Sequence, residues 1–344
     1  MNPFLQEIYA QPQAVRDTAA YLQSAAAGAT LQSIVNTWES GTYNRIVATG
    51  MGSSYFIAEA FATLCAGEGI PAFALNAGEL LHYQKAVLKD SLILAISQSG
   101  ESYETLALVK EADIRPEAVI ALTNNPDSSL TGYACHLLTT KAGEEKMTST
   151  KTFITAWQVA WTLAGALCGK RALGPWEEIA RGIEALLKSS VQEAAALVGE
   201  APFITFTARG TDFASARQSA LMCMEALHLP SAALTGGDFR HGPLEMVGPG
   251  KTLVVLTATA SPTFAQSQRL VKDALAFGGN VLLVSDEDLS PQERLCHLRI
   301  PATEPSLALI LQVIPLQLLV CALGESRGMV PGDFYHGNKV TSTE

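Results

Sequence analysis

The chain has 344 residues, of which 48% are apolar, and it carries a net charge of −10. This length indicates two domains of roughly 150 residues each, and no segment has the composition of a disordered region. The acidic balance excludes an extended nucleic-acid surface, which needs clustered Lys and Arg, but it allows a small anion bound by backbone N–H groups and hydroxyls.

Targeting and redox features indicate a reduced, cytoplasmic protein. No apolar run reaches the roughly 18 uninterrupted residues of a membrane span, because Gln312, Pro315 and Gln317 interrupt the longest run, at 307–323. The N-terminus has no basic segment before an apolar core, so we expect no export signal. The six cysteines are far apart and form no C-x-x-C pair, which favours buried free thiols.

Strands and helices are expected to alternate along the chain. In the first half, β-branched runs predict strands at 45–49, 91–97, 118–123 and 136–140, with helices at 53–66 and 103–111. In the second half the strands are expected at 203–207, 252–257, 280–285 and 297–301, with helices at 212–227 and 264–277. This alternation predicts an α/β fold in which parallel sheets are flanked by helices.

The two halves repeat each other at a nearly constant offset. Corresponding positions lie 158 to 162 residues apart, and the matching pairs are Gly52 with Gly210, Ser97 with Thr257, Val119 with Val281, and His136 with His297. The sequence therefore predicts a duplicated α/β unit. We expect a helical segment at 1–30, a first domain at 31–170, a linking helix at 171–198, a second domain at 199–330 and a tail at 331–344.

Two serine-rich turns in the first half follow predicted strands and precede predicted helices. One is the loop Ser97-Gln98-Ser99-Gly100-Glu101-Ser102, and the other contains Gly52, Ser53 and Ser54. Ligands bind at this edge of parallel sheets, where free N–H groups and the helix dipole favour an anion. Each turn alone fits an ordinary helix cap equally well, but two together favour a phosphate site. The second half has Thr257-Ala258-Thr259-Ala260-Ser261-Pro262 instead, so we expect one such site per chain.

These turns do not match the nucleotide-binding motifs. A P-loop needs G-K-[ST], and a dinucleotide fingerprint needs a third glycine. His82, His136, His228 and His297 are interpreted as structural, and no pair has metal-ligand spacing. We therefore expect no metal and no cofactor.

Four motifs together resemble the SIS (sugar isomerase) domain family. They are I-S-Q-S-G-E-S-Y-E-T, G-M-G-S-S, A-G-E-E-K-M-T-S-T-K and F-R-H-G-P-L-E. The two-domain layout is similar to the isomerase half of glucosamine-6-phosphate synthase and to the related fructosamine-6-phosphate deglycases and glucosamine-6-phosphate deaminases. The resemblance implies two tandem SIS domains, each a flavodoxin-like three-layer sandwich.

The resemblance also implies roles for individual residues. Ser97, Gln98, Ser99 and Ser102, with Ser53, would hold a 6-phosphate, and Ser149 and Glu144 would line the sugar hydroxyls. Glu225, in an otherwise apolar helix, suits a general acid/base, and by resemblance it would move the proton between C1 and C2. His241, on a Gly-Pro turn, would open the sugar ring and would come from the neighbouring subunit of a homodimer. Lys339 in the tail would close over the sugar.

The helix at 216–225 departs from the synthase pattern. The family Glu and the Lys used in isomerisation are replaced by Gln218 and Met222, and Met222 cannot carry a proton. The deglycase-like relatives also have an apolar residue there. The chain shows no glutaminase domain, and Asn2 stands where the nucleophilic Cys would be, so we expect no ammonia from glutamine.

The predicted function is an enzyme, a deglycase or deaminase that acts on a 6-phosphorylated amino sugar or a fructosamine-type adduct. An aldose–ketose phosphosugar isomerase is the nearest alternative. A non-catalytic sugar-phosphate sensor is the third. No nucleic-acid or membrane partner is expected.

Overall fold

The computed structural model describes residues 2–111, 114–170, 173–332, 334–336 and 339–341, and it divides the chain into two compact units. The first unit comprises Ala10–Glu145, Ser149–Ala180 and His336–Glu344. The second unit comprises Met1–Tyr9, Lys146–Thr148 and Arg181–Tyr335. Parts of the predicted tail, at 333, 337–338 and 342–344, and of the predicted linker, at 171–172, lie outside the described residues.

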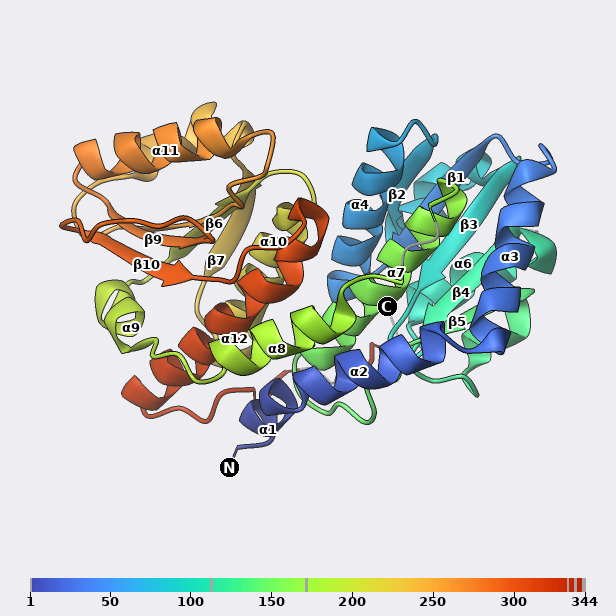
Figure 1. The fold of residues 1–344 in the computed structure, drawn as a ribbon, viewed down its shortest axis with the longest axis horizontal. Coiled ribbons are helices and arrows are strands. Elements are labelled where there is room, and N and C mark those ends of the chain that lie inside the picture. The colour runs from blue at the N-terminus through green and yellow to red at the C-terminus, as the bar shows by residue number, and fades with distance from the viewer. Residues whose placement is uncertain (1, 112–113, 171–172, 333, 337–338, 342–344) are drawn as a thin grey trace. The chain divides into compact units, whose positions relative to one another are not determined.

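The first unit is built on a parallel sheet with the strand order β2-β1-β3-β4-β5 (Figure 1). Its strands are β1 (Arg45–Gly50), β2 (Ala72–Asn76), β3 (Ser91–Ile96), β4 (Val119–Thr123) and β5 (His136–Thr139). Strands β3 and β4 are buried along their whole length, as expected for parallel strands covered on both faces. This is the flavodoxin-like order.

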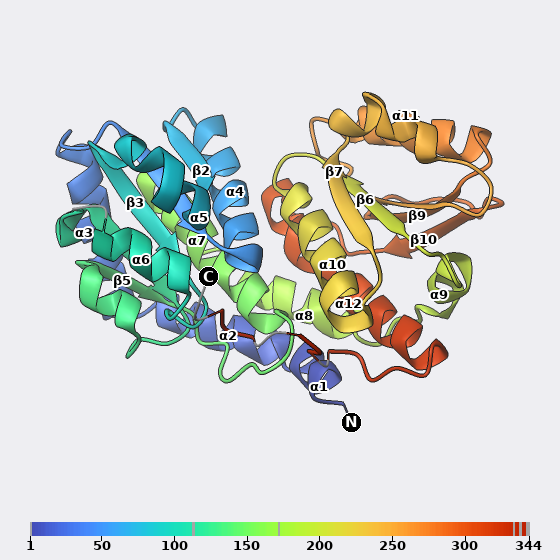
Figure 2. The ribbon, with the colours of Figure 1, turned by 180° about the vertical axis from the view of Figure 1, so that it is seen from behind.

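Helices cover both faces of this sheet. Residues that alternate along the strands, such as Val47 and Ile93, pack with the face that carries α6 (Tyr103–Glu111). The other face is covered by α4 (Gly52–Gly67), which contacts β1 and β2, and by α7 (Lys151–Leu167), which packs on α4 (Figure 2). The remaining helices of this unit are α2 (Gln11–Leu22), α3 (Ala25–Glu39) and α5 (Ala77–Glu79). The first unit is thus a three-layer sandwich.

The second unit repeats the same plan, with the strand order β10-β9-β8-β6-β7. Its strands are β6 (Ile204–Ala208), β7 (Ser231–Thr235), β8 (Thr252–Leu256), β9 (Asn280–Ser285) and β10 (Leu295–Arg299). Read from β7, this order matches the first sheet strand for strand, because β7, β6 and β8 stand where β2, β1 and β3 stand. Its helices are α1 (Pro3–Tyr9), α9 (Gln192–Val198), α10 (Asp212–Leu227), α11 (Phe264–Ala276) and α12 (Ala308–Ser326), and α8 (Trp176–Leu186) precedes α9.

The apolar run around Pro315 forms one continuous helical segment in spite of its three interruptions. Pro305–Ser326 is long and apolar enough to cross a membrane by length and composition, and among the described residues no other helix is. However, 94% of this window is buried inside the protein, as in a core helix. Gln312 and Gln317 are themselves fully buried.

The eight predicted strands are confirmed to within one or two residues, but each sheet has a fifth strand that the pattern analysis missed. These are β2 and β7, whose sequences are Ala-Phe-Ala-Leu-Asn and Ser-Ala-Ala-Leu-Thr. Both lie at a sheet edge and are largely half-buried. Their alanines give neither the β-branched enrichment nor the alternation by which a strand is recognised.

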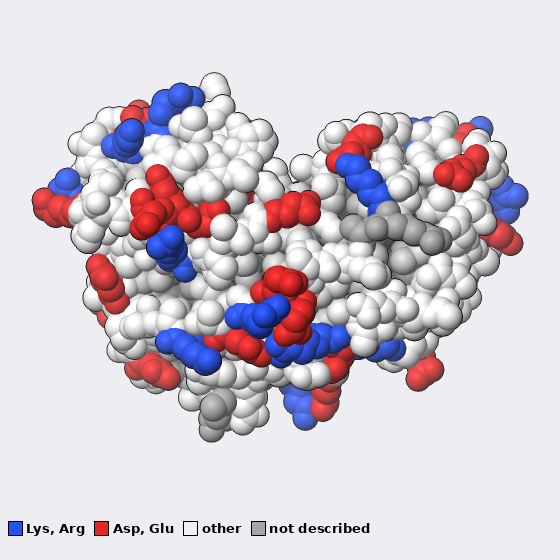
Figure 3. All heavy atoms as spheres, viewed as in Figure 1, with Lys and Arg blue, Asp and Glu red and all other residues white. Residues whose placement is uncertain are grey.

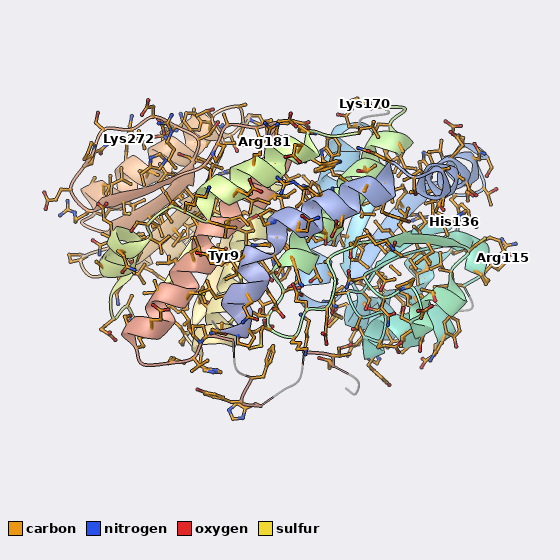
Figure 4. The ribbon with its side chains drawn as sticks, turned by 60° about the horizontal axis from the view of Figure 1, so that its bottom comes forward. Tyr9, Arg115, His136, Lys170, Arg181 and Lys272 are labelled. Carbon is orange, nitrogen blue, oxygen red and sulfur yellow. The ribbon has the colours of Figure 1, made fainter. Side chains whose placement is uncertain are left out.

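The histidines at matching positions are both structural. Nε2 of His136, labelled in Figure 4, lies 3.3 Å from the Thr37 hydroxyl. Nε2 of His297 lies 3.0 Å from the Ser285 hydroxyl. Burial lowers the pKa of both imidazoles, which favours the neutral form.

The cysteines are free thiols, as the sequence predicts, and the face drawn in Figure 3 carries charges of both signs. All six cysteines are free, and four of them are buried. Burial raises the pKa of Cys223 and Cys321 to about 12, so these thiols stay protonated. On the face drawn in Figure 3, acidic and basic side chains are mixed, and no broad field of Lys and Arg forms there.

Candidate functional site

The two serine-rich turns follow adjacent strands of the first sheet, β1 and β3. The chain leaves these two strands toward opposite sides of the sheet, which is the topological switch point where open α/β sheets bind ligands. The turns approach closely at Gly50, where a Cβ would lie 2.7 Å from the carbonyl oxygen of Ile96. After it, Gly52 adopts a φ of +50° as α4 begins. Glycine permits this conformation and this approach.

The loop at 97–102 is shaped by its own hydroxyls. The N–H of Gly100 donates to Oγ of Ser97 at 3.1 Å, and the N–H of Glu101 donates to Oγ of Ser99 at 3.1 Å. Gly100 has a φ of +68°, and a Cβ there would lie 1.9 Å from Oγ of Ser128. Within the described part of the chain, the N–H groups of Gln98, Ser99 and Ser102 donate to no acceptor. These N–H groups are suited to an anion.

A pocket opens at this switch point. It is lined by polar groups from the strand ends over an apolar floor, and its lining residues are Ser53, Ser54, Ile57, Ile96, Gln98, Leu122, Thr123, Asn124, Thr140, Ser149, Thr152, Phe153 and Ala156. All of them belong to the first unit. The structure therefore brings four predicted residues together, namely Ser53, Ser54, Gln98 and Ser149.

The other predicted residues of this half lie in the turns or outside the pocket wall. Ser97 is buried, Ser99 and Ser102 are half-buried, and Gly52 is exposed at the start of α4. Glu144 is exposed, whereas its neighbour Glu145 is 5% exposed. The carboxylate that this motif turns inward is thus the one that the sequence analysis did not choose.

Three pocket residues that the sequence analysis missed come from the ends of β4 and β5. Thr123 donates to the carbonyl of Gln98 at 3.2 Å. Asn124 accepts from the Thr140 hydroxyl at 2.7 Å and donates to the carbonyl of Gly143 at 2.9 Å. The sequence already predicted that strands end at residues 123 and 140. Because ligands bind where parallel strands end, the argument that singled out the serine-rich turns applies to these residues too.

The Glu145 carboxylate organises the wall of the pocket formed by the start of α7. Its Oε1 accepts from the N–H groups of Thr150 at 2.9 Å and Thr152 at 3.1 Å. Its Oε2 accepts from the hydroxyls of Thr152 and Ser149 and from Nζ of Lys339 at 2.7 Å. Burial alone would raise the pKa of Glu145, but the Lys339 charge and these hydrogen bonds outweigh burial and lower it. The group therefore stays ionised.

The C-terminal segment at 339–341 contacts the same unit a second time. The carbonyl of Thr341 accepts from the N–H of Tyr103 at 3.1 Å. Tyr103 is the first residue of α6 and directly follows Ser102. One tail segment thus contacts the residue that follows the loop at 97–102 and, through Glu145, the start of α7.

Glu225, the predicted acid/base, lies on α10 in the second unit. It is half-buried, between the buried Cys223 and Ala226, and the hydroxyl of Thr148 donates to its Oε2. Met222, one turn earlier, is fully buried. Near its C-terminal end, α10 therefore offers the Glu225 carboxylate and no second proton carrier at position 222.

His241 is presented by a loop between two short 3-10 turns, Asp238–Arg240 and Pro243–Met246, and it is exposed. Phe239 is buried in the core beside α11, and Arg240 pairs with Asp273 at 2.8 Å. Gly242 has a φ of +123°. The loop is thus anchored by Phe239 and Arg240 before His241 and by Leu244 after it, whereas His241 itself is exposed.

The corresponding edge of the second sheet carries carboxylates. Asp212, at the start of α10, is 5% exposed, and its Oδ1 has no hydrogen-bond partner among the described residues. Burial, with a contribution from the Asp286 carboxylate, raises the pKa of Asp212 to about 7. Asp286 itself accepts from the N–H and the hydroxyl of Thr259, each at 2.7 Å. This edge is unsuited to an anion.

Comparison with curated proteins finds relatives of about twice this length. The glutamine–fructose-6-phosphate aminotransferase (isomerizing) of Pyrococcus horikoshii is 30% identical over 338 residues, which cover 95% of this chain and 55% of the relative. That of Methanothermobacter thermautotrophicus is 27% identical over 337 residues, with the same coverage. The chain spans about half the length of the curated relatives it matches.

Solved structures share the fold over nearly the whole chain. The C-terminal domain of glucosamine-fructose-6-phosphate aminotransferase from Francisella tularensis has a TM-score of 0.82 at 21% identity and covers 98% of both chains. Tagatose-6-phosphate ketose/aldose isomerase from Escherichia coli has a TM-score of 0.82 at 20% identity, covering 97% of this chain and 96% of that one. Glucosamine-6-phosphate deaminase from Thermotoga maritima has a TM-score of 0.73 at 20% identity, covering 98% and 99%.

A family model locates the two copies directly. The model described as SIS domain matches residues 42–164 and again residues 200–323. These matches contain the two parallel sheets and leave out the N-terminal helices and the tail. The protein belongs to the SIS domain family and carries two SIS domains in tandem.

Proposed function

We propose that this protein is a phosphosugar-processing enzyme, a deglycase or deaminase that releases an amine from a 6-phosphorylated amino sugar or a fructosamine-type adduct. The observation that carries the proposal is the pocket at the β1/β3 switch point. Its serine hydroxyls and the N–H group of Gln98, with the N–H group of Ser99 in the adjoining loop, suit a phosphate. Asn124 and Ser149 add polar groups of the kind that hold sugar hydroxyls.

The chemistry requires a proton carrier near C1 and C2 of the sugar. We assign this role to Glu225, which moves the proton between the two carbons and so converts the amine into an imine. Water then adds to the imine carbon, and the C–N bond breaks to leave a carbonyl and the free amine. Support comes from the position of Glu225 on α10, where it is half-buried beside the buried Ala226.

Two further residues, His241 and Lys339, are assigned roles at the sugar ring and over the bound sugar. His241 opens the sugar ring, and it belongs to the partner subunit of a homodimer, so that each site needs two copies of the chain. Lys339 covers the bound sugar. The buried Met222 supports amine release over synthase-type isomerisation, because a thioether cannot take the place of a proton-carrying Lys. The cytoplasmic location expected from the sequence stays a prediction.

The test is to mix purified protein with fructosamine-6-phosphates and with glucosamine-6-phosphate, and to follow hexose phosphate and free amine. Release of amine from a 6-phosphorylated substrate, and none from its unphosphorylated form, is the expected result. Binding of these compounds without turnover of any of them would contradict the proposal and leave a sugar-phosphate sensor.

An aldose–ketose isomerase is the second candidate. It is favoured by the similarity to tagatose-6-phosphate ketose/aldose isomerase, which extends over 97% of this chain. Interconversion of unmodified hexose phosphates, with no amine release from any amine-bearing substrate, would select this activity.

A further inference from the structure

We infer that Glu145 is a positioning residue that holds Lys339 of the C-terminal tail against the wall of the pocket. The inference rests on the proposed function only in treating that pocket as the phosphosugar site. The side chain of Glu145 is 0% exposed and that of Lys339 is 17% exposed, and their charged atoms lie 2.7 Å apart. The two residues are 194 positions apart in the chain.

The Glu145–Lys339 ion pair is largely buried and fully hydrogen-bonded on the carboxylate side, unlike an exposed surface ion pair. A buried carboxylate without compensation is strongly disfavoured. Here it accepts from two backbone N–H groups, from the neighbouring hydroxyls and from Nζ of Lys339. By contrast, Glu68 and Lys170, the latter labelled in Figure 4, form a pair of similar length, 2.6 Å, whose side chains are 38% and 60% exposed. Exposed pairs of this kind contribute little to stability.

One oxygen of Glu145 connects the tail with the pocket. Its Oε2 accepts from Nζ of Lys339 and also from the hydroxyls of Ser149 and Thr152, both of which line the pocket. The ammonium group is therefore held at the same wall as these two hydroxyls. Removing either charge is expected to release the tail and to free the two hydroxyls to reorient.

Glu145 also takes the place of a helix cap. Thr150, at the N-cap position of α7, makes no side-chain cap hydrogen bond, and the N–H groups of Thr150 and Thr152 donate to Glu145 instead. A carboxylate at this end of a helix is favoured by the helix dipole. The first turn of α7 and the tail therefore depend on the same negative charge.

Tyr103 supplies a reporter that lies away from the pair. Its N–H donates to the carbonyl of Thr341, two residues after Lys339. If Glu145 holds the tail, loss of the Glu145 charge exposes the Tyr103 amide to exchange although Tyr103 itself is unchanged. A role of Glu145 confined to α7 leaves this amide protected.

The experiment compares Glu145→Gln, Lys339→Met and the double variant with the wild-type chain, and Glu68→Gln is the matched control. Amide hydrogen exchange is measured at Tyr103 in the unliganded protein, and glucosamine-6-phosphate binding is measured by calorimetry. We expect each single variant to accelerate exchange at Tyr103 about tenfold or more and to weaken binding about tenfold. The double variant is expected to be no worse than the more affected single variant. Lys339→Arg keeps the charge and is expected to recover most of the protection.

Three outcomes would overturn the inference. They are unchanged exchange at Tyr103 in Glu145→Gln, single effects that add in the double variant, or equal effects in Glu68→Gln. If Glu145→Gln does not fold, Lys339→Met alone decides, because it alters only the tail end of the pair. If the wild-type chain binds no phosphosugar, the proposed function fails, whereas exchange at Tyr103 still tests whether Glu145 holds the tail.

Discussion

The two SIS domains share a strand order and a histidine at matching positions of β5 and β10 but differ at the carboxyl ends of their strands. In the first domain, the N–H groups of Gln98 and Ser99 in the loop after β3 donate to no acceptor among the residues that the structure describes. In the second domain, the loop after β8 is occupied, because the N–H and the hydroxyl of Thr259 donate to Asp286. The second copy thus supplies its own anion where the first leaves room for a ligand.

This difference shows which features a duplicated fold retains. The strands keep their apolar faces because both copies bury them between the same layers of helices. The strand ends face solvent or ligand, so packing does not constrain them in the same way. The first copy can therefore specialise in binding and the second in other chemistry.

The largest effect is expected from a substitution that removes the proton carrier assigned to the second copy and leaves phosphosugar binding by the first copy intact. Glu225→Gln keeps the shape of the side chain but cannot take up a proton. We expect amine release to fall by about 10²–10⁴-fold, the usual contribution of a positioned acid/base, with the Kd for glucosamine-6-phosphate unchanged. Met224→Leu, an exposed change one residue earlier, serves as the control. Full turnover in Glu225→Gln would show that Glu225 is not the proton carrier.

The next prediction tests the buried carboxylate of the second copy. The pKa of Asp212 is raised to about 7, so between about pH 4 and 7 the folded state holds a proton that the unfolded state has lost. The free energy of unfolding contributed by this group therefore falls as pH rises through that window, by at most roughly 4 kcal/mol. Asp212→Asn is expected to flatten this dependence in urea unfolding from pH 5 to 8.

The control for this measurement is Asp288→Asn, whose side chain is 86% exposed in the same unit. It is expected to follow the wild-type pH dependence. An Asp212→Asn curve parallel to that of the wild type would mean that Asp212 titrates normally and that the second copy differs less from the first than we infer.

A third prediction concerns a substitution that distorts the loop at 97–102 in the first copy. At Gly100 a Cβ would lie 1.9 Å from Oγ of Ser128, and the φ of +68° disfavours any side chain. We expect Gly100→Ala to abolish phosphosugar binding in calorimetry and to destabilise the protein by about 1–3 kcal/mol. At Gly132 no atom lies within 4 Å of the added Cβ, so Gly132→Ala is expected to bind normally. Equal behaviour of the two variants would contradict this role of the loop.

The smallest effect on phosphosugar binding is expected from substitutions at equivalent positions of the two copies. Ser97 and Thr257 occupy matching sites after β3 and β8, and both are buried. Ser97→Ala removes one of the two acceptors of the Gly100 N–H, the Ser97 hydroxyl, and leaves the Ser97 carbonyl. We therefore expect phosphosugar binding to weaken about tenfold, as for one lost hydrogen bond. Thr257→Val is expected to leave binding unchanged. A larger loss from Thr257→Val would place the ligand in the second copy.

The residue pattern predicted most of the fold because the central strands of both sheets are buried on both faces. Such strands have continuous β-branched runs, which predicted the six central strands, and the same pattern also predicted the edge strands β5 and β10. The edge strands β2 and β7 were not predicted, because they are alanine-rich and largely half-buried. Strand ends also predicted Ser53, Ser54 and Gln98, since the carboxyl edge of a parallel sheet gathers whatever follows its strands.

Only the tertiary structure decided which acidic residue faces inward and what it contacts. Glu144 and Glu145 are neighbours with the same side chain, and no local pattern distinguishes the exposed one from the buried one. Lys339 reaches Glu145 across 194 positions, and this contact depends on how the chain returns to the first sheet. Backbone periodicity is a local property, whereas the compensation of a buried charge depends on groups that folding brings together from distant parts of the chain.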